Sequence, residues 1–219
     1  MAGEPESLHV HEPLKARLER HDYDRLLMLS DGVFAIAITL LALELKLPPG
    51  WNGSIEQLLS ATGRPLVGYL FGCALVGVFW FVHRRLIAQL EQVDGVIAVL
   101  NLLLLGLVGL TPYVARMIAE AGPTRAMPFY LVAVASVFGS VALIQAWASF
   151  HPRLLHAGVD RVSWRTNMAF HALSAVGLGG VGSWAIATHR PFSSEAFLAV
   201  ALILVGGRRL TRRWPRRGR

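Results

Sequence analysis

Two carboxylates stand inside an apolar stretch near the start of the chain, and they are the residues most able to do chemistry there. The stretch reads SDGVFAIAITLLALEL, with Asp31 at its beginning and Glu44 near its end. An ionisable side chain at membrane depth is costly, and it usually serves an ion pathway, a proton relay or a buried polar cluster. Asp31 is therefore the first candidate, whereas Glu44, beside Lys46 and Pro48, is expected to reach the membrane interface.

Polar side chains in three apolar segments are candidates to meet Asp31. Arg25 precedes Asp31 by six positions, so contact within one helix is poor, but contact across a helix interface is easy. The other expected members of this polar cluster, all at similar depth in the cytoplasmic half, are Ser30, Trp80, His83 and Asn101. Such a cluster could brace helix packing or take part in gating, and the residues alone leave both interpretations open.

The remainder of the same stretch carries an apolar stripe with one hydroxyl. Ile36, Thr39 or Leu40, and Leu43 are spaced i, i+3 or i+4, and i+7, which places them on one face of a helix. A stripe of this kind is typical of packing and of lipid contact as well as of a pore lining. Its spacing alone therefore does not assign a function.

The elements that must position these residues are membrane helices. Hydrophobic residues make up 54% of the chain and charged residues 16%, far from the balance of soluble proteins. The apolar residues gather in runs much longer than barrel strands, so an all-α integral membrane bundle is predicted. Six spans are expected, at 26–47, 65–82, 96–115, 128–150, 166–188 and 194–207, of which the last is short. Gly68 and Gly72, four apart, allow close helix approach.

Basic residues orient this bundle. With the N-terminus inside, sixteen of the 21 Lys and Arg residues fall on the cytoplasmic side, as the positive-inside rule requires. Residues 1–24 are then a cytoplasmic lead without the apolar core of a signal peptide, 25–207 the membrane domain, and 208–219 a basic cytoplasmic tail. The tail is expected to lie near anionic lipid headgroups, and no nucleic-acid partner is predicted.

Several kinds of chemistry are not indicated. Cys73 is the only cysteine, which excludes an internal disulfide and a multi-cysteine metal site. His171 stands alone in its apolar segment and is expected to be a hydrogen-bonded structural residue. The sequence carries no phosphate-binding loop, nucleophile elbow or paired catalytic carboxylates, so we expect neither an enzyme nor a cofactor.

These residues together resemble a known family. The run SDGVFAIAITLLALEL after Arg25, the Trp80 and His83 pair, and the run from Asn101 that ends in Thr-Pro resemble the prokaryotic branch of the transmembrane-protein-175 family. The family usually has Phe before the Ser-Asp pair, where this chain has Leu29. The resemblance implies a potassium channel in the plasma membrane of a prokaryote, with one six-helix unit per chain and assembly into a homotetramer.

The resemblance also implies roles for individual residues. Four copies of the first helix would line a central pore, with Ile36 and Leu43 narrowing it and Leu40 adding an apolar layer. Thr39 matches the position associated with potassium preference. The residues that match the family's polar network near the cytoplasmic side are Arg25, Ser30, Asp31, Trp80 and His83.

The leading functional prediction is a passive, potassium-preferring cation channel with a hydrophobic constriction and no carbonyl filter loop. Its expected partners are copies of itself and lipids, and its only ligand is the permeating potassium ion. The alternative is a proton-coupled secondary transporter or a proton pathway, in which Asp31 and His83 titrate. A third possibility is a scaffold protein without a pathway.

Overall fold

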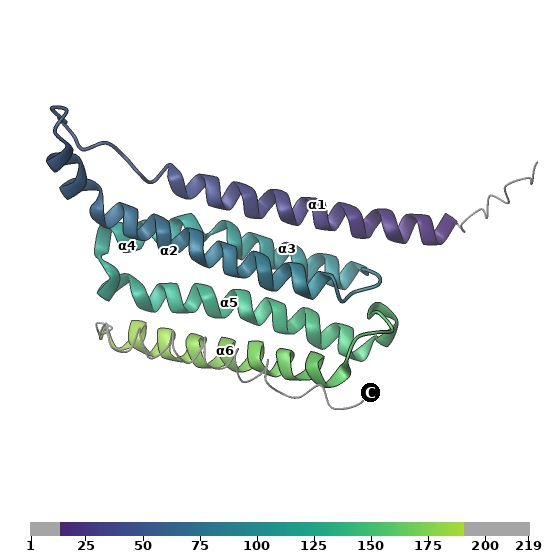
Figure 1. The fold of residues 1–219 in the computed structure, drawn as a ribbon. Coiled ribbons are helices and arrows are strands. Elements are labelled where there is room, and N and C mark those ends of the chain that lie inside the picture. Colours follow the sequence, from purple (N-terminus) through teal and green to yellow (C-terminus); the bar gives the residue numbers. More distant parts are fainter. Residues whose placement is uncertain (1–13, 191–219) are drawn as a thin grey trace, which may run out of the picture.

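The computed structural model describes residues 14–190, with side chains described from residue 21 on except at position 64. This part of the chain is all α-helical. The elements in chain order are α1 (Leu14–Ala42), α2 (Ile55–Ile87), α3 (Gly95–Gly109), α4 (Thr111–Ala121), α5 (Pro123–Phe150), the short 3-10 helix η1 (Pro152–Leu154) and α6 (Arg161–Ala187). Figure 1 shows the long helices side by side, with α1 and α6 on opposite sides of the bundle.

Five segments are long and apolar enough to cross a membrane, which confirms the all-α membrane prediction for this part of the chain. They are His21–Ala42, Pro65–Ile87, Gly95–Ala121, Pro123–Phe150 and Arg161–Ala187. The predicted sixth span, 194–207, lies outside the described residues and stays a prediction. Below, the outer end of the bundle is the end with the α1–α2 connection, and the inner end is the end with the α2–α3 connection.

The end of the first span was predicted wrongly. The prediction continued the helix to residue 47, but α1 ends at Ala42. Leu43 lies in a turn beyond the helix, where its amide donates to the Leu40 carbonyl at 3.1 Å. The Pro48-Pro49 pair explains why the helix does not reach Leu47, because a proline disfavours helical backbone in the residue before it.

The third span is divided into two helices, whereas the prediction treated it as continuous. α3 ends at Gly109 and α4 begins at Thr111, with the Leu110 amide donating to the Leu107 carbonyl at 3.2 Å. Pro112, in the first turn of α4, has no amide hydrogen and therefore breaks the helical ladder at this point.

Two other helices begin before their predicted spans because polar residues cap them. Ser54 caps α2 by accepting from the Gln57 amide, and Asp160 caps α6 by accepting from the amides of the first turn. Such caps satisfy amides that have no partner inside the helix. A hydropathy window detects the apolar part of a helix and not its capped polar end.

Close packing between α2 and its neighbours depends on two glycines. A Cβ on Gly68 would lie 2.9 Å from the Ala115 carbonyl oxygen of α4, and one on Gly72 would lie 2.6 Å from a Leu41 methyl of α1. The predicted close helix approach at this pair is thereby confirmed. The glycines bring α1, α2 and α4 close enough for their side chains to interact.

Candidate functional site

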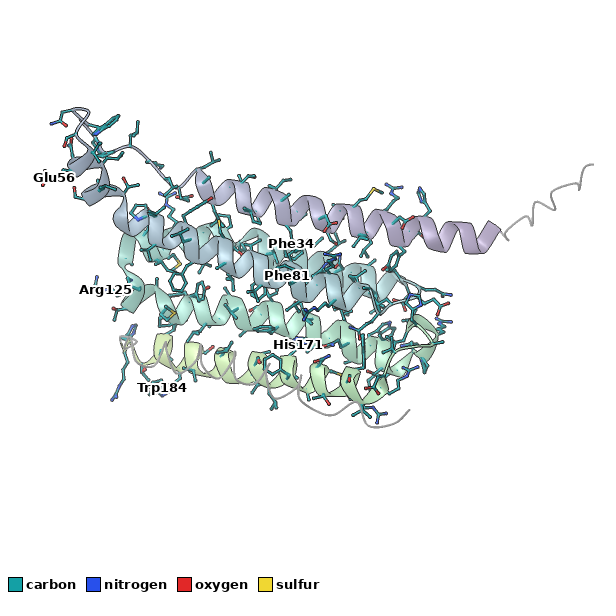
Figure 2. All side chains as sticks on the ribbon, in the orientation of Figure 1. Phe34, Glu56, Phe81, Arg125, His171 and Trp184 are labelled. Carbon is teal, nitrogen blue, oxygen red and sulfur yellow. The ribbon has the colours of Figure 1, made fainter. Side chains whose placement is uncertain are left out.

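The part of α1 whose side chains are described has one face packed on the bundle and one face free. The packed face consists of buried side chains at helical spacing, namely Leu26, Ser30, Phe34, Ala37 and Leu41. Figure 2 shows Phe34 on α1, near the side that faces α2. The predicted polar cluster involves the packed face, and the predicted stripe lies on the free one.

A buried chain of hydrogen bonds joins three helices at the inner half of the bundle. His83 Nε2 lies 2.8 Å from Asn101 Oδ1, and Asn101 Nδ2 donates to Ser30 Oγ at 3.0 Å. The Ser30 hydroxyl donates in turn to the Leu26 carbonyl at 2.7 Å. The three side chains are essentially inaccessible, at 0% for Ser30 and Asn101 and 1% for His83. This chain ties α1 to α2 and α3.

The donors and acceptors in this chain have one consistent direction. Because the Ser30 hydrogen goes to a carbonyl, Ser30 must accept from the Asn101 amide, and the Asn101 oxygen must then accept from His83. His83 therefore carries its proton on Nε2. Its Nδ1 is buried and has no hydrogen-bond partner among the described residues, and the Phe34 ring packs beside it with centroids 5.4 Å apart.

Asp31 belongs to a second, separate set. Trp80 Nε1 donates to Asp31 Oδ1 at 2.9 Å, and the Arg84 guanidinium lies over the Trp80 ring at 5.4 Å. Asp31 is exposed, in contrast to the buried chain. Arg25 is also exposed and joins neither set among the described residues. The single cluster that the sequence suggested is thus two separate hydrogen-bonded sets, which contain the neighbouring α1 residues Ser30 and Asp31 respectively.

The stripe lies on the free face of α1. Ile36, Leu40 and Leu43 are 58%, 41% and 68% exposed, so the described chain leaves a large part of each side chain uncovered. Thr39 is also exposed, and its hydroxyl donates to the Ile36 carbonyl at 2.9 Å. Leu43 continues the stripe from a turn and not from the helix.

Sequence reasoning missed two contributors near α1. Phe34, four residues after Ser30, packs on His83, and this i+4 spacing was a signal that could have identified it. Arg116 of α4 lies 3.8 Å from Glu44, just beyond the end of α1, and 2.8 Å from Glu120. No local pattern pairs Arg116 with Glu44, because the fold alone brings α4 to this position.

Within residues 14–190, no group of three or more His, Cys, Asp or Glu side chains is placed to hold a metal ion. His171 Nδ1 lies 2.7 Å from Gln145 Oε1, which confirms that this histidine is a hydrogen-bonded residue between α5 and α6.

Comparison with known proteins places this site in a family. Residues 25–112 match the family described as "Endosomal/lysosomal potassium channel TMEM175". A potassium channel of Streptomyces collinus is 35% identical over 121 residues, which is 52% of this chain and 59% of that protein. A potassium channel of Chamaesiphon minutus is 32% identical over 151 residues, which is 65% of this chain and 74% of that protein.

A human relative matches a smaller share of its own length. The human endosomal/lysosomal proton channel TMEM175 is 34% identical over 116 residues, which is 48% of this chain and 21% of that protein. The chain thus spans 59% of the Streptomyces relative and about a fifth of the human one. The matched residues 25–112 contain both hydrogen-bonded sets and the whole stripe. The chain belongs to the TMEM175 family.

Proposed function

We propose that this protein is a passive, potassium-preferring cation channel whose central pore is lined by α1 from four copies of the chain. The observation that carries the proposal is the free face of α1 and the turn after it, where Ile36, Thr39, Leu40 and Leu43 are all exposed in the described chain. A second observation supports it, since bacterial relatives are named potassium channels.

Aliphatic rings from this face would form the gate. A narrow apolar throat excludes water and therefore ions, and small rotations of the lining helices readmit both. Ile36 and Leu40 are one helical turn apart, so they would form successive layers about 6 Å apart along the pore. Leu43 follows the helix end, so the position of its layer would depend on the turn.

Thr39 would supply the polar contact for the ion. Its hydroxyl hydrogen is directed to the Ile36 carbonyl, which leaves the oxygen lone pairs available to a cation. Four such oxygens replace only part of a hydration shell, so the expected potassium preference is modest compared with stacked carbonyl rings.

The buried chain of Ser30, Asn101 and His83 would hold the inner half of α1 against α2 and α3 while the free face admits ions. In this proposal both termini are cytoplasmic, the membrane is the prokaryotic plasma membrane, and copies of the chain and lipids are the only partners. No cofactor is needed besides the permeating ion.

The experiment is potassium flux into liposomes that contain the purified protein. We expect flux along the potassium gradient, a tetrameric mass, and faster flux for Ile36→Ala, because the smaller side chain widens the throat. Ile38→Ala is the matched control, since Ile38 is exposed on α1 but lies outside the stripe.

Thr39→Val should lower the preference for potassium over sodium. Absence of flux while a valinomycin control works, with no tetramer, would refute the proposal.

A proton pathway is the second candidate, because the human relative is named a proton channel. It would use Asp31 and His83, although these residues lie in separate hydrogen-bonded sets. A proton pathway predicts that flux requires a pH gradient and that Asp31→Asn abolishes it. The potassium channel predicts flux without a pH gradient that survives Asp31→Asn.

A further inference from the structure

α2 is longer than its membrane-spanning part. The helix has 33 residues, and the candidate span Pro65–Ile87 accounts for 23 of them. A helix of about 20 residues already crosses the hydrocarbon, so the preceding turns must lie at or beyond the membrane surface. We call residues 51–64, which comprise these turns and the residues that lead into them, the outer arm.

The outer arm is bent away from the span and held in shape by its own hydrogen bonds. Pro65 lies inside α2, where it removes a backbone hydrogen bond and its ring clashes with the preceding turn, which kinks a helix. Figure 1 shows the first turns of α2 at an angle to the remainder of the helix. Trp51 Nε1 donates to the Ser54 carbonyl at 2.8 Å, and Ser54 Oγ caps the helix.

The outer arm has one apolar side and one polar side. Ile55 and Leu59 are one helical turn apart and are 71% and 66% exposed, and Trp51, which precedes the helix, is 40% exposed. Glu56 and Ser60, one position after Ile55 and Leu59, are exposed polar residues and lie on the adjoining side by helical spacing, and Figure 2 labels Glu56 at the first turns of α2. Separate faces of this kind are characteristic of helices that lie in a membrane interface.

The apolar side of the arm lines up with an apolar row on the membrane span, with Thr62 and Gly63 between the two. Leu66 and Leu70 follow Leu59 on the same face of α2, and both are exposed. This face is opposite the one on which Gly68 and Gly72 contact α4 and α1. A bilayer supplies a single continuous environment for such a row, from acyl chains along the span to the headgroup boundary along the arm.

We propose that the outer arm binds the bilayer surface, with Trp51, Ile55 and Leu59 inserted at the boundary of acyl chains and headgroups in the outer leaflet. Trp is enriched at this depth because its ring is apolar and its N–H is polar, and here the N–H already has an acceptor. The arm thus anchors the connection that follows α1. This inference stands independently of the ion that the protein conducts.

Site-directed spin labelling tests the depth of the arm. The single native cysteine allows a Cys73→Ser background in the full chain. Labels are placed at Ile55→Cys and Leu59→Cys, and at the matched control positions Glu56→Cys and Ser60→Cys. Power saturation with oxygen and with a water-soluble nickel chelate is measured in phosphatidylcholine and phosphatidylglycerol vesicles.

We expect the ratio of oxygen to nickel collision rates to be several-fold higher at Ile55 and Leu59 than at Glu56 and Ser60, because oxygen concentrates in the acyl region. Pro65→Ala should straighten α2, lift Leu59 from the interface and raise its nickel collisions. Equal nickel access at all four positions would place the arm in water and overturn the proposal. Exclusion of both reagents, with dipolar broadening between labels, would assign the surface to a second copy and would also overturn it.

Discussion

Asn101→Leu is the substitution whose effect the structure defines best. Asn101 is fully buried and joins His83 and Ser30 through contacts of 2.8 and 3.0 Å. Leucine has a similar volume but cannot make either hydrogen bond. Ser30 would keep its bond to the Leu26 carbonyl, whereas both nitrogens of His83 would be without a partner.

The free-energy cost follows from these two losses. Hydrogen bonds between membrane helices are worth about 0.6 kcal/mol on average and at most about 1.7 kcal/mol. An unsatisfied buried donor costs about 1–3 kcal/mol. We therefore expect Asn101→Leu to lower the free energy of unfolding by about 2 kcal/mol, most of it from the stranded His83 N–H.

A double-mutant cycle measures the contribution of the contact itself. The free energy of unfolding is obtained from SDS titrations in mixed micelles for wild type, Asn101→Leu, His83→Phe and the double variant. Because His83→Phe removes the stranded donor, the double variant should be more stable than the sum of the single effects predicts, by about 0.6–1.7 kcal/mol. Leu103→Ala, at a site 50% exposed on the same helix, is the control and should change stability by less than about 0.5 kcal/mol.

Two results would refute this reasoning. The first is a wild-type free energy of unfolding for Asn101→Leu, which would mean that the buried chain contributes nothing to helix packing. The second is strict additivity, with a coupling below about 0.3 kcal/mol, which would mean that the contact between His83 and Asn101 does not stabilise the folded protein.

Other parts of the bundle make further predictions. Gly182→Ala should destabilise by about 1–3 kcal/mol in the same titration, because its Cβ would lie 2.7 Å from the Pro128 carbonyl oxygen, which belongs to a helix backbone. Gly106→Ala, where a Cβ meets nothing within 4 Å, should instead be neutral or stabilising. At the inner end, the Ser163 hydroxyl and the first-turn amides of α6 lower the pKa of the Asp160 carboxyl below its usual 3.8. This cap is stabilising above that value and is lost as pH falls through the lowered pKa, so Asp160→Asn should weaken the loss of thermal stability on acidification below pH 3.8.

Features that depend on local sequence were predicted well. The apolar runs indicated the five described membrane segments because hydrocarbon selects such runs irrespective of tertiary contacts. The helical period placed Ile36, Thr39 and Leu40 on one face of the first helix, and all three are exposed on α1. The end of α1 was placed too late because hydropathy favoured Leu43 and Leu45, although α1 ends at Ala42 and the Pro48-Pro49 pair disfavours helix at Leu47.

Features that depend on how helices pack were predicted less completely. Asp31 and His83 were expected in one cluster, since both are polar and lie at similar depth. In the fold, Asp31 bonds to Trp80 on the exposed side, and His83 bonds to Asn101 in the interior. The rotation of α2 about its own axis decides which of its side chains faces Asp31 and which faces Asn101. The periodicity of a single segment does not contain this information.

The sequence by itself determined that this is a membrane bundle, which residues share a face of α1, and which family the chain resembles, because these properties depend on hydropathy and helical period. Only the tertiary structure decided that the buried chain of Ser30, Asn101 and His83 excludes Asp31, that Arg116 reaches Glu44, and that the outer arm bends away from its span. The physical reason is that these contacts join different helices, whose separation and rotation are set by close packing at positions such as Gly68 and Gly72.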